Sequence, residues 1–278
     1  MKVTILVENI STSNLLCEHG LSLFIEYNNK YYLLDAGQSE IFIKNAKILN
    51  VPLDKVEFAV LSHGHYDHSG GFYELLKINP ETKIFAMTDT MNEYYSASGG
   101  MHPIGVPSKI LQMYKDNFEL LNSTAKLDTG VYVVPHSTKN LEKIGERTGL
   151  YKTVDGELVP DDFSHELSLV FETEKGLVVF NSCSHGGILN IISEVKSVFK
   201  NKDIYAFIGG LHMKGTKNGE ECCTFSKDEV CVIAKTLEDL NLKKLYTGHC
   251  TGEKGFELLS IFMDDRVEPI NTGKTIVI

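Results

Sequence analysis

LSHGHYDHSGG (residues 61–71) holds three histidines and one aspartate within six positions, namely His63, His65, Asp67 and His68. Alternate residues of an extended turn point the same way, so His63 and His65 can bind one ion while Asp67 and His68 face a second. Gly64 lets the backbone bend between these ligands. Imidazole and carboxylate suit zinc, iron or manganese, and two such ions ~3.5–4 Å apart can share a hydroxide. The stretch therefore predicts a metal site.

The runs on either side alternate between strand and helix patterns. Strands are expected at 56–62, 82–87, 130–135, 165–172, 176–182, 203–210, 243–249 and 274–278, and a hairpin over 21–37 around Asn28 and Asn29. Helices are expected at 41–50, 70–79, 108–121, 187–199, 226–240 and 255–262. The helix at 226–240 opens with a capping box from Ser226 to Glu229. The pattern predicts one α/β domain over 1–278, in two similar halves, with a lid-like insertion at about 90–125.

Four of these strands end in a loop that carries histidine. One leads into residues 63–68, and the others end in VVFNSCSH, AFIGGLH and LYTGHC, which contain Cys183, His185, His212 and His249. Ligand sites in α/β sheets form beyond the carboxyl ends of the strands, so we expect these side chains to converge. The glycine pair before His212, Gly209 and Gly210, indicates close backbone packing.

Composition disfavours several classes of partner. The chain has 37 acidic and 27 basic residues and a net charge of −10, which disfavours nucleic acid and anionic membranes. No apolar stretch approaches the ~18 residues of a membrane span, and the start, MKVTILVENI, lacks the pattern of a signal peptide. The six cysteines include no CxxC pair. These features predict a cytoplasmic protein in a reducing compartment.

SHGHYDHSGG resembles the HxHxDH signature of the metallo-β-lactamase superfamily, and the resemblance covers nearly the whole chain. It implies an α/β fold, a four-layer αβ/βα sandwich with two central mixed sheets and external helices. YYLLDAG is similar to the first motif of the superfamily, which implies that Asp35 supports the metal loop from behind the ligands. LYTGHC is similar to the last motif, which supplies the final histidine, here His249.

The middle motifs depart from the common pattern of the superfamily. Cys183 stands where most members carry a bridging aspartate, and His185 follows two residues later. We expect His185, rather than Cys183, to be the metal ligand. His165 begins a predicted strand and is expected to be exposed.

Spacing and resemblance together assign two divalent ions, with zinc as the first choice and iron or manganese as alternatives. One ion is assigned to His63, His65 and His185, and the other to Asp67, His68 and His249. Asp67 is also expected to orient the attacking hydroxide. His212 stays open as a ligand, a substrate contact or a structural residue.

The motifs SHGHYDHSGG, SCSHGG, GGLH and TGHCTG are together similar to one branch of the superfamily. That branch includes the archaeal dihydropterin ribofuranosyl-aminobenzene 5'-phosphate synthases, and its bacterial members are usually labelled metal-dependent hydrolases. CEHGLSLFIE also resembles the branch, which implies that Glu18 and His19 line the pocket. A helix that begins near Thr251 or Gly252 favours anions, so we expect a phosphate or carboxylate of the substrate there.

These features predict a metal-dependent hydrolase or phosphate-handling enzyme that acts on a small anionic substrate through a metal-bound hydroxide, with chemistry related to the pterin-phosphate synthases. An iron-dependent redox or oxygen enzyme and a non-catalytic ligand sensor on the same fold are the alternatives. The diiron branch usually carries a glutamate where His65 stands, and a sensor need not keep every ligand. The inserted helix could serve either as a lid over the site or as a contact in a homodimer, and the sequence does not choose between these roles.

Overall fold

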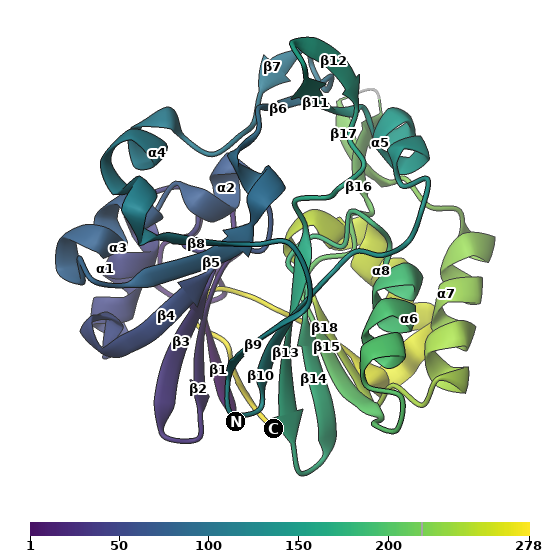
Figure 1. The fold of residues 1–278 in the computed structure, drawn as a ribbon. Helices are drawn as coiled ribbons and strands as arrows, with labels where there is room; N and C mark the ends of the chain where they lie inside the picture. Colours follow the sequence, from purple (N-terminus) through teal and green to yellow (C-terminus); the bar gives the residue numbers. More distant parts are fainter. Residues whose placement is uncertain (218) are drawn as a thin grey trace. The chain divides into compact units, whose positions relative to one another are not determined.

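The computed structural model describes residues 1–217 and 219–278, which divide into two compact units. Unit 1 comprises Met1–Thr124, Pro135–Leu167 and Asn271–Ile278, and unit 2 comprises Ala125–Val134 and Ser168–Ile270. Each unit is built on one seven-stranded mixed sheet with helices along one face of that sheet (Figure 1). The predicted α/β class, with two mixed sheets and external helices, is confirmed.

The sheet of unit 1 joins an antiparallel half to a parallel half. Its order is β20-β1-β2-β3-β4-β5-β8, formed by β1 (Lys2–Val7), β2 (Ser22–Tyr27), β3 (Lys30–Leu34), β4 (Val56–Val60), β5 (Lys83–Met87), β8 (Phe118–Leu121) and β20 (Thr275–Val277). Strands β20 to β3 pair antiparallel and β3 to β8 pair parallel. Asn28 and Asn29, with φ of +51° and +59°, form the predicted two-residue hairpin turn.

Helices cover one face of this sheet (Figure 1). They are α1 (Ile41–Ile48), α3 (Phe72–Ile78) and α4 (Ser108–Tyr114), and the short α2 (Tyr66–Ser69) precedes α3; 3-10 turns lie at Leu53–Lys55, Thr88–Met91 and Lys115–Asn117. Phe42 and Phe72 lie fully buried in the core between helices and sheet. Burial of each such ring contributes about 1.5–3 kcal/mol, which holds α1 and α3 against the strands.

The predicted helix over 108–121 is only partly present. Helix α4 ends at Tyr114, and Phe118–Leu121 forms β8, which pairs in parallel with β5. The edge of β5 offers these residues backbone hydrogen-bond partners, and Phe118 is buried there. Apolar spacing alone does not separate a helix from a short strand that completes a sheet. The single domain and the lid-like insertion at about 90–125 stay predictions.

A second, smaller sheet of unit 1, which we call the auxiliary sheet, was not predicted. Its order is β12-β11-β6-β7, all antiparallel, formed by β6 (Tyr94–Ser96), β7 (His102–Pro103), β11 (Leu150–Val154) and β12 (Glu157–Pro160). Helix α5 (Glu142–Thr148) precedes β11. Tyr94 of β6, Leu150 of β11 and Phe163 form a buried apolar cluster.

The sheet of unit 2 is also mixed and carries helices on one face (Figure 1). Its order is β19-β18-β15-β14-β13-β10-β9, formed by β9 (Ala125–Asp128), β10 (Val131–Pro135), β13 (Leu167–Thr173), β14 (Gly176–Phe180), β15 (Ile204–Ile208), β18 (Lys244–Thr247) and β19 (Val267–Pro269). The helices are α6 (Ile188–Val198), α7 (Lys227–Asp239) and α8 (Gly252–Met263). Strands β14, β15, β18 and β19 pair in parallel, so their carboxyl ends lie at one edge.

Helix α7 begins as predicted. The Glu229 N–H donates to the Ser226 hydroxyl, and the Ser226 N–H donates to the Glu229 carboxylate. Before it, β16 (Lys214–Lys217) and β17 (Glu220–Cys223) form an antiparallel pair. Cys222 and Cys223 lie in β17, where pairing with β16 satisfies their backbone groups.

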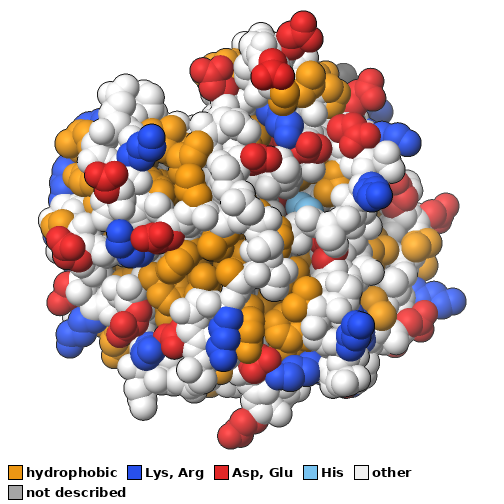
Figure 2. Space-filling model, viewed as in Figure 1, with side chains coloured by type: hydrophobic (Ala, Val, Ile, Leu, Met, Phe, Trp, Pro, Cys, Tyr) orange, Lys and Arg blue, Asp and Glu red, His pale blue; other side chains and the backbone are white. Residues whose placement is uncertain are grey.

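Charged side chains of both signs are scattered over the face shown in Figure 2, with apolar side chains between them. This distribution agrees with a chain whose net charge is −10 but which keeps 27 basic residues. Within residues 1–217 and 219–278, no helix combines the length and the apolar character that crossing a membrane requires.

Candidate metal centre

The loop with the predicted ligands follows β4 in unit 1. The chain leaves β4 at Val60 and enters α2 at Tyr66. Its four predicted ligands, His63, His65, Asp67 and His68, are all buried. The ring centroid of His63 lies 4.5 Å from that of His65 and 4.2 Å from that of His68. The backbone therefore gathers the three imidazoles of the motif.

Asp35 lies behind this loop, directly after β3. Its carboxylate accepts hydrogen bonds from the Ser62 N–H (2.8 Å), the Ser62 hydroxyl (2.7 Å) and His68 Nδ1 (2.7 Å). Its φ of +58° is rare for a residue other than glycine, and the Asp35 N–H bond to the Val60 carbonyl holds that conformation. The expectation that Asp35 supports the loop is confirmed by these contacts.

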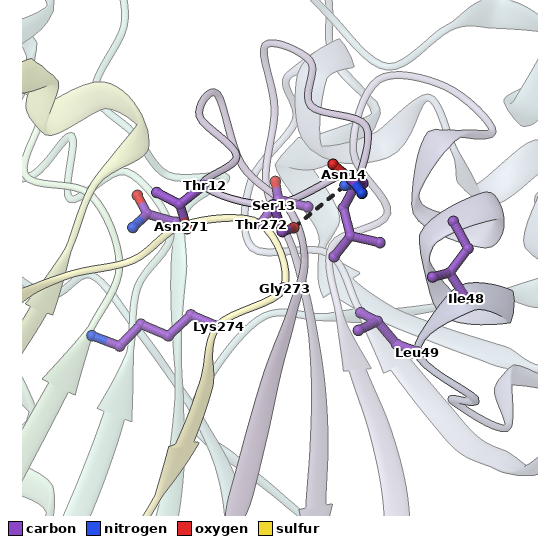
Figure 3. Close-up of a pocket in the computed structure, with 10 residues that line it drawn as sticks. Thr12, Ser13, Asn14, Ile48, Leu49, Asn271, Thr272, Gly273 and Lys274 are labelled. Carbon is purple, nitrogen blue, oxygen red and sulfur yellow. Dashed lines mark hydrogen bonds between the residues drawn. The ribbon is translucent and has the colours of Figure 1, made fainter.

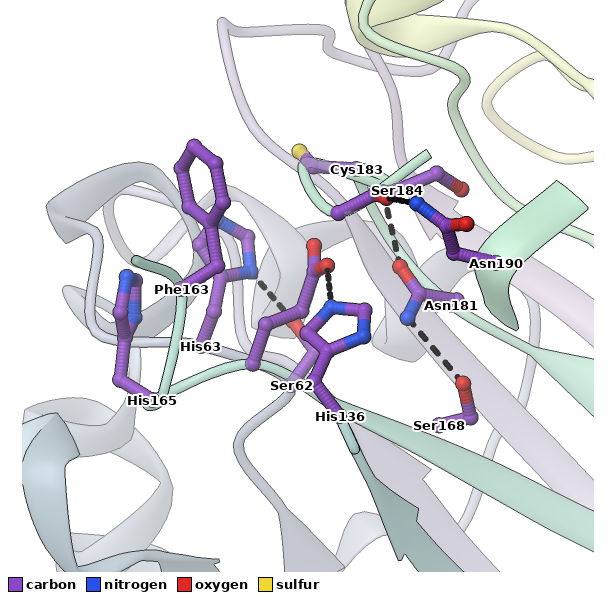
Figure 4. A network of polar contacts seen from close by, with 12 residues as sticks. Ser62, His63, His136, Phe163, His165, Ser168, Asn181, Cys183, Ser184 and Asn190 are labelled. Carbon is purple, nitrogen blue, oxygen red and sulfur yellow. Dashed lines mark hydrogen bonds and ion pairs between the residues drawn. The ribbon is translucent and has the colours of Figure 1, made fainter. Parts of the chain in front are cut away.

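These contacts determine which nitrogen of each imidazole carries the proton. The Asp35 carboxylate only accepts, so both His68 Nδ1 and the Ser62 hydroxyl donate to it. Ser62 has one hydroxyl proton, so in its 2.8 Å contact with His63 Nδ1 the imidazole is the donor (Figure 4). His63 and His68 thus both carry a proton on Nδ1, so Nε2 is the nitrogen of each ring that a metal would take; Nε2 of His68 lies 3.4 Å from Asp67 Oδ2.

The electrostatics of the loop favour a cation. Burial, with a smaller contribution from His165, lowers the pKa of His65 to about 3, so this imidazole is neutral, as a metal ligand must be. Burial also acts to lower the pKa of His68, but the carboxylates of Asp67 and Asp35 outweigh it and raise that pKa to about 10. The carboxylates of Asp35 and Asp67 therefore stabilise a positive charge at this position. That charge can be a proton on His68 or a bound divalent ion.

The donor set of unit 1 fits a divalent metal. One ring nitrogen each of His63 and His68 lies within 4.8 Å of the other and of a carboxylate oxygen of Asp35. Imidazoles beside buried carboxylates form the mixture that suits zinc, iron or manganese. Asp35 is the orienting partner, since its oxygens already hold Ser62 and His68 in place. The four ligands proposed from the motif remain candidates.

His19 and Glu18, both expected to line the pocket, have different surroundings. His19 Nε2 lies 3.3 Å from Asp67 Oδ2, and its side chain is 55% exposed. His19 therefore stands in solvent beside a candidate ligand. The Glu18 carboxylate accepts from the N–H groups of Gln38 and Ser39 and from the Ser39 hydroxyl. Glu18 thus fixes the chain before α1.

The other candidate ligands follow three adjacent parallel strands of unit 2. His185 follows β14, His212 follows β15 and His249 follows β18. Within this unit the loops therefore meet at one sheet edge, as expected. Ser184, His212 and His249 have φ angles of +52°, +48° and +52°. Left-handed backbone at three such positions stores strain of the kind that clusters at functional sites.

The three loops of unit 2 contact one another through sulfur and imidazole groups. The ring centroids of His185 and His212 are 4.3 Å apart. The His212 N–H donates to Cys250 Sγ (3.3 Å), and Cys250 Sγ donates to the Cys183 carbonyl (3.5 Å). The role of His212 stays open, but it lies beside His185 rather than apart from it.

The glycine pair before His212 permits this packing. A Cβ on Gly209 would lie 1.8 Å from the Asn181 carbonyl oxygen, and one on Gly210 would lie 2.4 Å from Cys250 Sγ. The close backbone approach predicted for the pair is confirmed. Asn181 also accepts from the Ser184 N–H and donates to the Ser168 hydroxyl, which orders the loop that leads to His185 (Figure 4).

At the predicted anion site, Thr251 and Gly252, the polar groups already have partners within the chain. Helix α8 begins at Gly252, but the buried Thr251 hydroxyl accepts from the Leu211 N–H (2.9 Å) and bonds Thr247 Oγ1 (2.6 Å). Glu221 of β17 accepts from the Glu253 N–H at 2.6 Å. The chain's own carboxylate thus occupies a position that the helix start offers to an anion. A substrate anion at Thr251 and Gly252 stays a prediction, and it would have to displace Glu221.

Thr251→Val is expected to lower the free energy of unfolding by about 1–3 kcal/mol, because the buried Leu211 N–H would lose its acceptor. Urea denaturation measures the change. Thr236→Val is the matched control, since the Thr236 hydroxyl bonds the Val232 carbonyl on the exposed side of α7. Wild-type stability of Thr251→Val, together with weaker competition by phosphate, would instead assign the hydroxyl to a ligand.

His165 was expected to be exposed, and this prediction was wrong: the residue is fully buried in unit 1. Its Nδ1 accepts from the Gly64 N–H (2.8 Å), and its Nε2 lies 3.0 Å from Asp161 Oδ2. The chain turns inward before β13 at Phe163, whose φ is +55°. The sequence contained one indication of the contact between Asp161 and His165, because the carboxylate lies four residues before the histidine.

Each unit also has a pocket. One of about 590 Å³ in unit 1 is lined by residues 12–15 and 271–274 with Ile48 and Leu49 (Figure 3). Another of about 500 Å³ in unit 2 is lined mainly by apolar side chains near the starts of α6 and α7. Neither lining includes a candidate ligand. Donor chemistry, rather than pocket volume, marks the candidate centre.

Comparison with known proteins agrees with this geometry. A family model described as the metallo-beta-lactamase superfamily matches residues 16–98. The 7,8-dihydropterin-6-methyl-4-(beta-D-ribofuranosyl)-aminobenzene-5'-phosphate synthase of Methanocaldococcus jannaschii is 30% identical over 276 residues, which cover 93% of this chain and 90% of the relative. This chain belongs to the metallo-β-lactamase superfamily.

Two further similar proteins are described as metal-dependent hydrolases. The crystal structure of Tm1679, described as a metal-dependent hydrolase of the β-lactamase superfamily, matches with a TM-score of 0.85 at 25% identity over 100% of this chain and 99% of that one. A metal-dependent hydrolase of Staphylococcus aureus is 34% identical over 95 residues, 33% of this chain and 39% of the relative. Metallo-β-lactamase superfamily members bind divalent metals, and residues 63–68 of this chain carry suitable donors.

Proposed function

We propose that this protein is a metal-dependent hydrolase or phosphate-handling enzyme that acts on a small anionic substrate. One observation carries the proposal: Asp35 and Ser62 hold His63 and His68 in the tautomer that leaves Nε2 for a metal. Such a chain of buried, oriented imidazoles has no packing purpose, whereas metal ligands need it. The superfamily membership of the chain supports the same reading.

The residues of the ligand loop have different roles in the proposed reaction. A divalent ion held there would polarise a substrate oxygen and supply a nucleophile at neutral pH. His63, His65 and His68 offer imidazole donors, and Asp67 offers a carboxylate that offsets the charge of the ion. His19, exposed beside Asp67, can donate a hydrogen bond to an anionic group of the substrate. Two ions, with zinc first and with His185 and His249 completing the two ligand sets, remain our proposal.

A phosphate group is the anion we favour for the substrate. The Methanocaldococcus jannaschii relative is named for a product that carries a 5'-phosphate on a pterin-containing molecule. The Staphylococcus aureus relative is named only as a metal-dependent hydrolase. A small molecule is proposed, rather than nucleic acid or a membrane, because the net charge of −10 opposes polyanionic surfaces. A homodimer stays a prediction.

A panel of metal-loaded assays tests the function. Phosphoesters, lactones and pterin precursors are offered to the protein with zinc, iron or manganese, and product is measured directly. Turnover of a phosphate-bearing compound, lost in His63→Ala, is the expected result. Oxygen consumption with iron would favour the redox alternative, and ligand binding without turnover would favour a sensor. Either of these outcomes contradicts the hydrolase proposal.

The choice between Cys183 and His185 as a metal ligand is tested by two variants. His185→Ala is expected to lose about half of the bound metal, whereas Cys183→Ser is expected to keep it, because the imidazole and not the thiol is the proposed donor. Elemental analysis of both proteins, purified side by side, measures the difference. Loss of metal from Cys183→Ser with retention in His185→Ala would reverse the assignment.

A further inference from the structure

His165 is tied to the metal loop by its ring and its backbone. Its Nδ1 accepts from the N–H of Gly64, the residue between His63 and His65, at 2.8 Å. Two residues later, the Leu167 N–H donates to the Ser62 carbonyl at 2.9 Å. The segment before β13 therefore runs along the loop and holds it at two successive points. A segment used only to fill the core would not need a hydrogen bond to the residue between two ligands.

Asp161 determines the tautomer of His165. The Asp161 carboxylate accepts from the Phe163 N–H (2.8 Å) and lies 3.0 Å from His165 Nε2. A carboxylate only accepts, so Nε2 carries the proton and Nδ1 is left as the acceptor that Gly64 needs. This is the opposite tautomer to that of His63 and His68. The pair thus acts as an oriented acceptor and not as a further set of metal donors.

The auxiliary sheet holds this pair in place. Lys152 of β11 donates to Asp162 (2.6 Å) and to the Ser164 hydroxyl (3.0 Å), which fixes the residues around Phe163. Tyr94 of β6 places its ring over the His165 ring, with centroids 4.0 Å apart and planes 35° apart. A Cβ on Gly64 would lie 2.9 Å from the Tyr94 ring, so the loop, Tyr94 and His165 are in close contact.

We propose that His165 is a positioning residue of the metal centre, whose Nδ1, oriented by Asp161, fixes Gly64 and thereby the spacing and angle between His63 and His65. This inference rests on the proposed metal-dependent function. Without the acceptor, the Gly64 N–H would be buried and unsatisfied, and the peptide would rotate to find another partner. Rotation of that peptide moves the two flanking ligands relative to each other. Partners of this kind typically change metal affinity by 10–100-fold.

Three variants test the role of His165. His165→Phe keeps a ring but removes the acceptor. His165→Asn keeps an acceptor near the position of Nδ1. Asp161→Asn keeps its carbonyl oxygen for the Phe163 N–H and turns its amide group toward His165, which forces the other tautomer and breaks the bond to Gly64 without a change in volume. Asn45→Leu is the matched control, since it removes buried hydrogen bonds of unit 1 to Leu6 and Leu16.

The readouts are the zinc dissociation constant, from competition with a chromophoric chelator, and the d–d absorption spectrum of the cobalt-substituted full-length protein. We expect His165→Phe and Asp161→Asn to bind zinc at least about 10-fold more weakly and to change the cobalt spectrum. His165→Asn is expected to recover most of the affinity, and Asn45→Leu to keep wild-type affinity despite lower stability. If His165→Phe does not fold, Asp161→Asn is compared with the wild type in its place.

The outcomes separate this inference from the proposed function. Wild-type affinity and an unchanged cobalt spectrum in folded His165→Phe or Asp161→Asn would overturn the positioning role alone. Equal losses in Asn45→Leu would also overturn it, because they would show an effect of general destabilisation. A wild-type protein that binds no zinc or cobalt would overturn the metal-dependent function together with the inference.

Discussion

Protein purified without added metal is expected to contain close to two equivalents of zinc, iron or manganese per chain, and the His63→Ala/His68→Ala double variant is expected to lose most of it. The reason is that these two imidazoles are the ones that Asp35 and Ser62 orient with Nε2 as the donor. Their removal takes one proposed ligand from each ion. Elemental analysis of dialysed protein measures the metal content directly.

His102→Ala is the control for adventitious binding by histidine, because His102 is exposed in the auxiliary sheet. It is expected to keep the full metal content. Less than half an equivalent of metal in the wild type would contradict a dinuclear centre. Retention of metal in the double variant would show that the ions are held elsewhere.

Asp35→Asn is expected to weaken metal binding by about 10–100-fold although Asp35 is not a proposed ligand. The new carbonyl oxygen can still accept from the Ser62 N–H. The new amide N–H groups would face the Ser62 hydroxyl and His68 Nδ1, which are donors to Asp35 in the native protein. His68 would have to accept at Nδ1, and the Ser62 proton would turn to His63 Nδ1. Both imidazoles would then carry the proton on Nε2, where the metal must bind.

Chelator competition measures this loss of affinity, and urea denaturation of the metal-free protein measures the accompanying loss of stability. We expect a stability loss of about 1–3 kcal/mol, the usual cost of a disrupted buried hydrogen-bond network. Glu18→Gln is the matched control, because Glu18 also accepts three hydrogen bonds in unit 1 but bonds Gln38 and Ser39. If Asp35→Asn bound metal as tightly as wild type, the tautomers of His63 and His68 would not depend on this carboxylate.

Local patterns were enough to predict the regular elements and the ligand loop. Asn28 and Asn29 predicted their hairpin because asparagine tolerates the left-handed backbone that a two-residue turn requires. Ser226 and Glu229 predicted the start of α7 because a capping box lies within four residues. His63 to His68 predicted a metal loop because the donors are neighbours in the chain. In each case the partners lie within one turn or loop, so their spacing is visible in the sequence.

Contacts between distant segments were decided only by the tertiary structure. His165 bonds Gly64 across 101 positions, and Glu221 reaches the start of α8 across 32 positions to Glu253. Neither contact leaves a periodic signal, so His165 was expected in solvent and the start of α8 was expected to be open to an anion. The same holds for β8, which is a strand only because the edge of β5 is there to pair with it.

The sequence by itself therefore indicated the candidate donors, the family and the strands after which those donors lie. The tertiary structure decided which nitrogen of each histidine is left for a metal, through the single hydroxyl proton of Ser62 and the carboxylate of Asp35. The physical reason is that a proton's position depends on the atoms within hydrogen-bond reach. For His63 and His68 the deciding carboxylate is that of Asp35, which only the fold brings to the ligand loop, and the Gly64 N–H that His165 accepts lies 101 positions away in the chain.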